Sequence, residues 1–236
     1  MAIDVYWGSG SPYSWRVLLA LEYKRLEYSS HLLQFSKQEH KAPNILALNF
    51  RGRVPILKDG DYVVFESLAV LYYLDLKYPA PPIFGRTPEE AGVIMRVISE
   101  YQSYTEPHVT RLVEALFAPR PAARREELTG AAREPLTGAL REELRAAMQV
   151  IASEARSIEA RLARSDWVVG DGFSAADIVI FPALKLLLRA LGKPAARELS
   201  ARFLPLEVNY PALGRWIARV EALPGYDRTF PPHWRN

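Results

Sequence analysis

The stretch from Ile3 to Tyr23, IDVYWGSGSPYSWRVLLALEY, constrains the fold of this chain more than any other. A short apolar strand over residues 3–7 enters a turn at residues 8–10, and a helix then opens with Ser11 as its N-cap and Pro12 at its first position. Such a corner points free backbone N–H groups and the positive end of a helix dipole at whatever binds above it. The sequence therefore predicts a site suited to an anion, a phosphate or a thiolate.

Two kinds of strand-turn-helix use a corner like this, and the residues distinguish them. A dinucleotide-binding fingerprint, G-x-G-x-x-G, needs a third glycine where this chain has Tyr13. The run Ser-Pro-Tyr-Ser at 11–14 instead resembles the Cys-Pro-Tyr-Cys of thioredoxin-like proteins, with serine in place of both cysteines. Because the chain contains no cysteine, this resemblance predicts a thioredoxin-like fold without protein thiol redox chemistry.

Composition excludes several classes of protein. No apolar run approaches the roughly 18 residues of a membrane span, and the N-terminus lacks the pattern of a signal peptide, so we expect a cytoplasmic protein without membrane partners. The net charge is +3, but basic and acidic residues are interspersed, which disfavours nucleic-acid binding. Metal-ligand spacing, a Walker motif and G-x-S-x-G are all missing, and we expect no metal.

The order of elements after the first helix predicts a small α/β domain over residues 1–80. Residues 27–33 read as a second strand, and the segment from Phe35 leads into a short helix that ends at Asn49. Two short apolar runs flank Asp59-Gly60 and predict a hairpin, and a helix that begins at Glu66-Ser67 follows. The order β-α-β and then β-β-α is the thioredoxin-like arrangement.

A second, all-helical domain is predicted over residues 89–236. The proline-rich segment 79–88 cannot continue a helix, so we place the domain boundary there, with residues 81–88 as a stiff linker. Beyond it helical periodicity dominates. Helices are expected over 89–117 with a disturbance at Pro107, over 139–162, from Ser174-Ala-Ala-Asp177 onward and over 211–223, with a solvated Ala/Arg/Glu-rich excursion at 119–145.

Four motifs in the right order resemble cytosolic glutathione S-transferases of the serine type, and the resemblance covers nearly the whole chain. They are the serine at the first helix start, LNFRGRVP at 48–55, Phe65-Glu66-Ser67, and WVVGDGFSAADIVIFPAL at 167–184. The resemblance implies a homodimeric detoxification enzyme that binds glutathione as co-substrate in its first domain. It also implies that the second domain contributes the site for a small hydrophobic electrophile.

The resemblance assigns the glutathione-binding residues. A cis peptide at Val54-Pro55 would present the Val54 backbone to the cysteinyl part of the ligand, whereas an ordinary strand-start proline is the plainer interpretation. Glu66 and Ser67, at a helix N-terminus, would hold the γ-glutamyl end or act only as helix caps. Arg53 would pair with the glycyl carboxylate or be solvated. Gln38 and His40, in the second-helix region, complete the expected set.

The catalytic hydroxyl must hydrogen-bond the glutathione sulfur, because a thiol with a pKa of about 8.5 is mostly protonated at neutral pH and only the thiolate attacks. Ser11 occupies the first cysteine position of Cys-Pro-Tyr-Cys and is our first choice. Ser14 is the second candidate, and Ser9 and Tyr6 follow. Ser11 would also act as a plain N-cap in front of the proline.

Candidates for the electrophile pocket lie in the second domain. Tyr101, Tyr104, His108 and Arg111 are spaced by three and four residues, which predicts one shared helical face. The face would line that pocket, or it would pack at a domain or subunit boundary. We interpret Asp177 as a structural helix cap rather than a catalytic acid.

The particular class within the family is open. Ser-Trp-Arg-Val at 14–17 resembles the zeta class, but the zeta run Ser-Ser-Cys is here Ser-Pro-Tyr at 11–13, and the lack of cysteine argues against the beta and omega classes. We therefore expect a zeta/theta-like glutathione transferase. The alternatives are a zeta-type glutathione-dependent isomerase or dehalogenase, and a non-catalytic binding or stress protein with the same fold.

Overall fold

The computed structural model describes residues 3–117 and 138–235. These residues belong to two compact units, and the chain passes between the units more than once. The first unit comprises Met1–Ile98, Trp167–Pro182 and Ile217–Asn236, and the second comprises Ser99–Asp166 and Ala183–Trp216. The domain limits expected from the sequence, with a boundary at 79–88, stay a prediction.

A four-stranded sheet forms the base of the first unit. Its strands are β1 (Ile3–Trp7), β2 (Tyr28–Leu32), β3 (Ile56–Asp59) and β4 (Tyr62–Phe65), in the order β2-β1-β3-β4. β1 runs parallel to β2 and antiparallel to β3, and β3 pairs with β4 in an antiparallel hairpin. This topology confirms the thioredoxin-like order predicted from the sequence.

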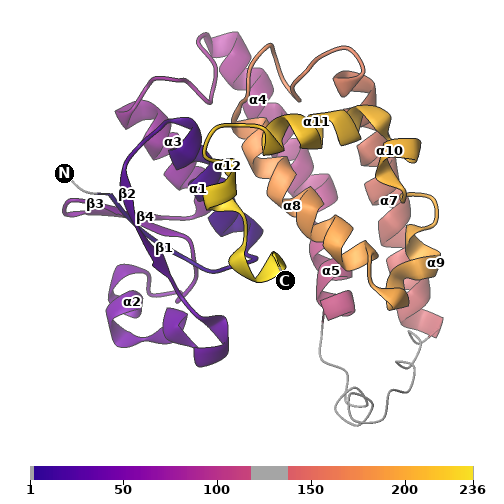
Figure 1. The fold of residues 1–236 in the computed structure, drawn as a ribbon, viewed down its shortest axis with the longest axis horizontal. Helices are drawn as coiled ribbons and strands as arrows, with labels where there is room; N and C mark the ends of the chain where they lie inside the picture. The colour runs from indigo at the N-terminus through magenta and orange to yellow at the C-terminus, as the bar shows by residue number, and fades with distance from the viewer. Residues whose placement is uncertain (1–2, 118–137, 236) are drawn as a thin grey trace. The chain divides into compact units, whose positions relative to one another are not determined.

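The helices of the first unit centre on α1 (Pro12–Tyr23), in which every residue from Ser14 to Glu22 is buried. α1 packs against α3 (Ser67–Lys77), whereas α2 (Pro43–Leu48) lies apart from both (Figure 1). The indole of Trp15 contacts four aromatic rings at centroid distances between 5.4 and 6.3 Å, and these belong to Phe181, Tyr226, Phe230 and Trp234. A helix buried on all sides is a core element, and α1 has that role here.

The proline-rich segment after α3 is fixed by a buried lysine. Lys24 Nζ donates to Asp75 Oδ1 at 2.7 Å, to the Tyr78 carbonyl at 2.8 Å and to the Pro81 carbonyl at 2.7 Å. The Asp75 carboxylate also accepts the backbone N–H groups of Ile83 (2.8 Å) and Phe84 (3.1 Å). All three protons of the ammonium thus have acceptors, and the linker is tied to the ends of α1 and α3.

The remaining regular elements of the described chain are helices, and none of those described is long and apolar enough to cross a membrane. They are α4 (Pro88–Glu100), the π-helical turn η3 (Tyr101–Thr105), α5 (Glu106–Phe117), α7 (Gly138–Leu162), α8 (Ala175–Leu191), η4 (Pro194–Ala196), α9 (Arg197–Ser200), α10 (Leu206–Asn209), α11 (Pro211–Glu221), α12 (Tyr226–Thr229) and η5 (Pro232–Trp234). The expected all-helical second part is confirmed.

The helix expected over 89–117 is interrupted, and the form of the interruption was not predicted. Residues 101–105 form a π-helical turn in which the Glu106 N–H bonds the Tyr101 carbonyl. Pro107 has no backbone N–H to donate to a carbonyl one helical turn earlier. The wider π-helical turn just before it accommodates this missing hydrogen bond.

The excursion expected at 119–145 lies mostly outside the described residues, and its last part needs correction. Residues 118–137 are not described. Its last part, from Gly138 onward, is not an excursion but the start of α7, because Ala, Leu, Arg and Glu are strong helix formers.

Within the second unit, side chains from α7 fix the neighbouring helices. The Glu159 carboxylate accepts the backbone N–H groups of Ala212 and Leu213, both at 2.8 Å, and so caps the start of α11. Arg111 on α5 forms a two-pronged ion pair with Glu143 on α7, at 2.5 and 2.9 Å. These contacts connect α7 to α5 and to the start of α11.

The start of α8 is capped by Asp177, as the sequence predicts. Its carboxylate is fully buried and accepts the Val168 N–H at 3.0 Å, the Ser174 N–H at 2.9 Å and the Ser174 hydroxyl at 2.9 Å. With these three donors the carboxylate serves as a structural cap that also fixes the preceding loop.

We predict that Asp177→Ala lowers the stability of the protein by roughly 2–4 kcal/mol, because two buried backbone N–H groups lose their acceptor. Chemical denaturation measures the change, and Asp171→Ala, at an exposed position of the same loop, is the matched control. Equal stability of the two variants would show that the cap contributes little.

A second buried carboxylate joins β3 to α3. Asp59 Oδ2 accepts hydrogen bonds from Lys77 Nζ at 2.7 Å, Tyr78 at 2.9 Å and Tyr73 at 3.1 Å. Burial by itself raises the pKa of the Asp59 carboxyl, but the hydrogen bonds from Lys77, Tyr78 and Tyr73 outweigh it and leave the pKa below its ordinary value. The ionised form is therefore favoured by the fold.

This shift predicts a contribution to stability that is present above the ordinary aspartate pKa of about 3.9 and is lost as the pH falls through the lower folded value. Asp59→Asn should be clearly less stable than wild type near about pH 7. The difference should shrink as the pH falls below about 4. Urea unfolding across this range tests it, with exposed Asp61→Asn as control. A gap that stays constant with pH would contradict the assignment.

Candidate active site

One edge of the sheet gathers four segments of the first unit. The register pairs Trp7 with Leu32, Tyr6 with Ile56, and Ile56 with Phe65. The chain therefore leaves β1, β2 and β4 and enters β3 at the same edge. The predicted glutathione-site residues follow or precede these strand ends: Ser11, Ser14, Gln38, His40, Arg53, Val54, Pro55, Glu66 and Ser67.

The two candidate serines lie in different surroundings at the α1 corner. Ser11 is the N-cap, half-exposed, and its Oγ accepts the Ser14 N–H at 3.2 Å. Ser14 is fully buried, and its own Oγ accepts the Gly8 N–H at 3.3 Å. The Ser11 hydroxyl uses a lone pair for capping and keeps its proton for a ligand, whereas the Ser14 hydroxyl is covered by protein.

Glycine is required at two positions of the turn, Gly8 and Gly10, because a larger residue there would collide with neighbouring side chains. A Cβ on Gly8 would lie 2.1 Å from Cζ of Phe35, whose ring therefore packs directly on the turn. Gly10 has φ +81°, and a Cβ there would lie 2.8 Å from Cε1 of His233. The turn is thus enclosed by the start of η1 (Phe35–Lys37) on one side and by the C-terminal tail on another.

The other hydroxyl candidates of the corner are engaged elsewhere. Ser9 Oγ lies 2.5 Å from Nδ1 of His233, which comes from η5 in the tail. Tyr6 stacks on His31 with ring centroids 4.6 Å apart, and His31 Nε2 lies 2.8 Å from Asp4 Oδ1. No local sequence pattern predicts these two histidine contacts, because each joins residues from separate segments of the chain.

Gln38 and His40 lie in the segment that follows β2. Gln38, between η1 and η2 (Glu39–Lys41), has φ 56°, and its amide nitrogen donates to the Phe35 carbonyl at 3.2 Å. The His40 ring packs edge-on against Phe35, with centroids 5.1 Å apart. Its Nδ1 atom is buried and has no hydrogen-bond partner within the described residues. A buried polar atom without a partner calls for an explanation, and a bound water or a ligand atom is one.

The residues before β3 combine an unusual backbone with an exposed cation. The Val54–Pro55 peptide is cis, which confirms that prediction. The Arg53 side chain is exposed, and its backbone carbonyl accepts Asn49 Nδ2 at 2.9 Å. The Arg53 side chain itself forms no hydrogen bond or ion pair within residues 3–117 and 138–235. Its guanidinium is therefore available to bind an anion.

The start of α3 is held by a buried arginine, Arg16. In the sequence this residue was noted only as part of Ser-Trp-Arg-Val at 14–17, the run that resembles the zeta class. Glu66, the N-cap, has φ 68°, a left-handed backbone that costs about 1 kcal/mol or more for a side chain other than glycine. Arg16 is fully buried in α1 and donates to Ser67 Oγ at 3.4 Å and to the Val179 carbonyl at 3.3 Å. Arg16 therefore connects the two helix N-termini of the site.

The candidates for an electrophile pocket do not share one α-helical face. Tyr101 and Tyr104 belong to η3, where the spacing of a π-helical turn replaces that of an α-helix. Tyr101 is buried, Tyr104 is 63% exposed, His108 is half-buried, and exposed Arg111 is bound to Glu143. Their role in binding an electrophile stays a prediction.

Together the sheet order and the serine-capped α1 define a thioredoxin-like domain followed by helices. The family model of the glutathione S-transferase N-terminal domain matches residues 10–77, and that of the C-terminal domain matches residues 112–224. The two matches follow the order of the sheet-containing part and the helical part along the chain.

Individual relatives cover nearly the whole chain. Glutathione S-transferase A of Pleuronectes platessa is 28% identical, over 98% of this chain and 92% of its own length. Glutathione S-transferase 2 of Schizosaccharomyces pombe is 30% identical, over 96% and 94%. The crystal structure of a glutathione S-transferase from the Antarctic clam Laternula elliptica is similar with a TM-score of 0.76 and 29% identity, over 100% of this chain and 95% of that one. The chain belongs to the glutathione S-transferase family, and it is a transferase.

We predict that His233→Ala loosens the tail, because the contact with Ser9 and the packing on Gly10 are both lost. One hydrogen bond of this kind contributes about 1 kcal/mol, so global unfolding should change little while trypsin cleaves faster at Arg228. Cleavage rates followed by mass spectrometry measure this, with His108→Ala as control. Unchanged cleavage would mean that the aromatic contacts of Trp15 alone hold the tail.

Proposed function

We propose that this protein binds glutathione at the sheet edge and stabilises its thiolate at the N-terminus of α1 for attack on a small hydrophobic electrophile. The observation that carries the proposal is the convergence of Ser11, Val54-Pro55 and Glu66-Ser67 at one edge, set by the strand register. Two helix N-termini and one extended backbone segment then present donors and acceptors to one ligand.

The start of α3 suits the γ-glutamyl end of glutathione. The Glu66 carboxylate would accept the ammonium, while the helix N-terminus and the Ser67 hydroxyl would donate to the carboxylate. Because Arg16 donates to Ser67 Oγ, this hydroxyl keeps its own proton for the ligand. The left-handed backbone of Glu66 is consistent with a residue held for binding rather than for local stability.

The middle and the far end of the ligand have their own partners. The backbone of Val54 would pair, strand-like, with the cysteinyl part. The glycyl carboxylate would meet the exposed Arg53 guanidinium and the buried Nδ1 of His40, which needs a hydrogen-bond partner. Gln38 lies in the same segment and completes this end of the site.

The reaction requires the thiol proton to leave and the sulfur to attack. At the corner, the Ser11 O–H and the positive end of α1 would stabilise the thiolate, so that the proton passes to solvent. A new C–S bond then forms as the electrophilic carbon gives up its leaving group or opens its double bond. Buried Ser14 would hold the turn through the Gly8 N–H, which makes it a positioning residue.

Assembly and class are also proposals. By resemblance to the family we propose a cytoplasmic homodimer, which analytical ultracentrifugation would test. The zeta-type isomerase or dehalogenase activity and the non-catalytic role remain alternatives. They are distinguished by whether glutathione is consumed, regenerated or only bound in assays with aryl halides and with unsaturated diacids.

We predict that ultraviolet absorbance of bound glutathione shows a thiol pKa at least about one unit below the free value of about 8.5, and that Ser11→Ala removes this shift. The loss of one stabilising donor should lower kcat/KM by roughly 100-fold. Ser9→Ala, at a neighbouring exposed hydroxyl that is engaged by the tail, should keep the thiolate.

Ser14→Ala separates the two candidates. If it removes the thiolate signal while the fold is intact, the assignment to Ser11 is wrong although the mechanism holds. If wild type binds glutathione without any thiolate absorbance, the protein is a binding protein rather than a catalyst. Failure to bind glutathione at all would overturn the proposed function.

A further inference from the structure

The segment 34–53, which lies between β2 and β3, carries an excess of positive charge. Its acidic residue is Glu39, and its basic residues are Lys37, Lys41, Arg51 and Arg53. The segment therefore accounts for the whole net charge of +3, and basic and acidic residues balance over the rest of the chain. All four basic side chains are exposed.

These positive charges are not neutralised by neighbouring carboxylates. Glu39 Oε2 accepts the backbone N–H of Gln34 at 2.7 Å. Lys41 Nζ donates to the Arg51 carbonyl at 3.1 Å, and the Arg51 guanidinium lies 5.0 Å from the centre of the Phe50 ring. Within 3–117 and 138–235 none of the four basic side chains forms an ion pair. Because like charges repel, an anionic ligand would stabilise this cluster.

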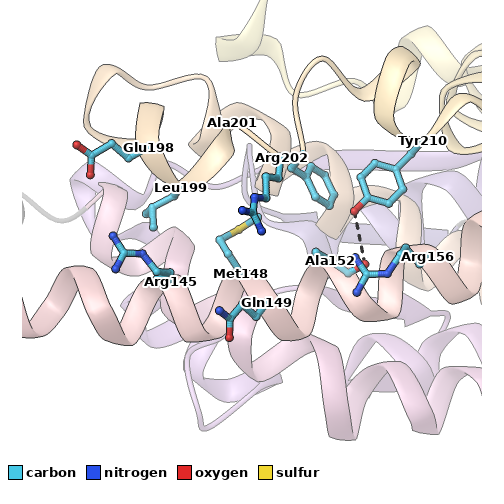
Figure 2. Close-up of a pocket in the computed structure, with 11 residues that line it drawn as sticks. Arg145, Met148, Gln149, Ala152, Arg156, Glu198, Leu199, Ala201, Arg202 and Tyr210 are labelled. Atoms are coloured by element: carbon cyan, nitrogen blue, oxygen red, sulfur yellow. Dashed lines mark hydrogen bonds between the residues drawn. The ribbon is translucent and has the colours of Figure 1, made fainter.

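Charged side chains in the second unit are arranged differently. A cavity of about 490 Å³ between α7 and the segment 198–210 is lined by arginines together with Glu198 (Figure 2). Arg145 pairs with Glu142 at 2.7 Å, and Glu198 lies 3.7 Å from Arg141. Charges of both signs thus alternate around that cavity, whereas the segment 34–53 presents mainly one sign.

A buried asparagine fixes the backbone of the two arginines. The Asn49 side chain accepts the Arg51 N–H at 3.1 Å and donates to the Arg53 carbonyl at 2.9 Å. The Asn49 carbonyl accepts the Gly52 N–H at 2.8 Å. Gly52 is buried with φ +56°, and a Cβ there would lie 2.9 Å from Lys41 Nζ. The ammonium of Lys41 therefore lies against the loop between the two arginines, and a ligand does not have to order this backbone.

The proposed contacts with glutathione use only part of this charge. At the far end of the ligand the glycyl carboxylate would meet Arg53 and the Nδ1 atom of His40, and glutathione has no further negative charge at that end. Lys41 follows His40 directly, and Arg51 lies two positions before Arg53. The charges of Lys41 and Arg51 thus exceed what one carboxylate requires.

We propose that the site prefers a thiol tripeptide whose third residue carries a second carboxylate in its side chain, and that Lys41 and Arg51 determine this preference. The inference rests on the proposed binding of glutathione at the sheet edge. The γ-glutamyl and cysteinyl parts would bind as those of glutathione do. The extra carboxylate would bind Arg51, whose guanidinium is able to form two parallel hydrogen bonds.

Isothermal titration calorimetry of the full chain with γ-glutamyl-cysteinyl-glutamate and γ-glutamyl-cysteinyl-glutamine, both kept reduced, tests the proposal. The two peptides have nearly the same size and differ by one negative charge. Wild type should bind the glutamate form at least about tenfold more tightly, because only that form engages the extra cations. The preference should shrink as salt is added, since exposed charges are screened.

Two double variants test the residues. Lys41→Gln/Arg51→Gln should remove the preference, and Lys41→Gln/Arg51→Glu should reverse it. Arg25→Gln, at an exposed arginine just beyond the C-terminal end of α1, is the matched control and should keep it. Circular dichroism checks that each variant is folded.

Titration with glutathione in parallel separates this inference from the proposed function. If wild type binds glutathione but binds the two peptides equally, the inference is overturned and the proposed function stands. Failure to bind glutathione overturns both. A preference that survives both double variants, or that Arg25→Gln also removes, would contradict the role of Lys41 and Arg51.

Discussion

Burial of α1 on all sides is the constraint on which the sheet-edge site depends. From Ser14 to Glu22 every residue is buried, Trp15 lies among four aromatic rings, and Lys24 closes the helix with three hydrogen bonds. Because close-packed interiors do not deform continuously, the helix cannot slide or rotate without disrupting this whole set of contacts. The position of its N-terminus, and of the Ser11 hydroxyl that caps it, is thereby fixed relative to the sheet.

The second helix N-terminus of the site is coupled to the first by Arg16. A fully buried guanidinium is costly to desolvate, and the cost is tolerable only when its N–H groups have acceptors. Here the acceptors include Ser67 at the start of α3 and the Val179 carbonyl in α8. The same contacts that satisfy the cation orient the Ser67 hydroxyl. A requirement of the core thus also serves the arrangement of the proposed ligand site.

Local features of the site were predictable from the sequence, and contacts between distant segments were not. The Ser11-Pro12 helix start and the Asp177 cap rest on patterns within a few residues, and the thioredoxin-like arrangement rests on the order of elements along the chain; the structure confirms all three. The contact of His233 with Ser9 joins residues that are 224 positions apart, and no spacing rule predicts it. The π-helical turn at 101–105 was also missed, because the pattern of apolar residues marks a disturbance near Pro107 but not its geometry. Burial explains the difference between the two serines: both occupy motif positions, but only Ser11 reaches the surface.

The lack of cysteine determines what chemistry the α1 corner is able to perform. In a thioredoxin-like corner the helix N-terminus lowers the pKa of a protein thiol, and the thiol then exchanges disulfides. With serine at both positions the corner keeps the same dipole and the same free N–H groups, but it has no thiol of its own to ionise or oxidise. A hydroxyl with a much higher pKa stays protonated and acts as a donor. In the proposed mechanism the stabilisation therefore passes to a thiol that the ligand brings, which turns a redox corner into a site for thiolate transfer.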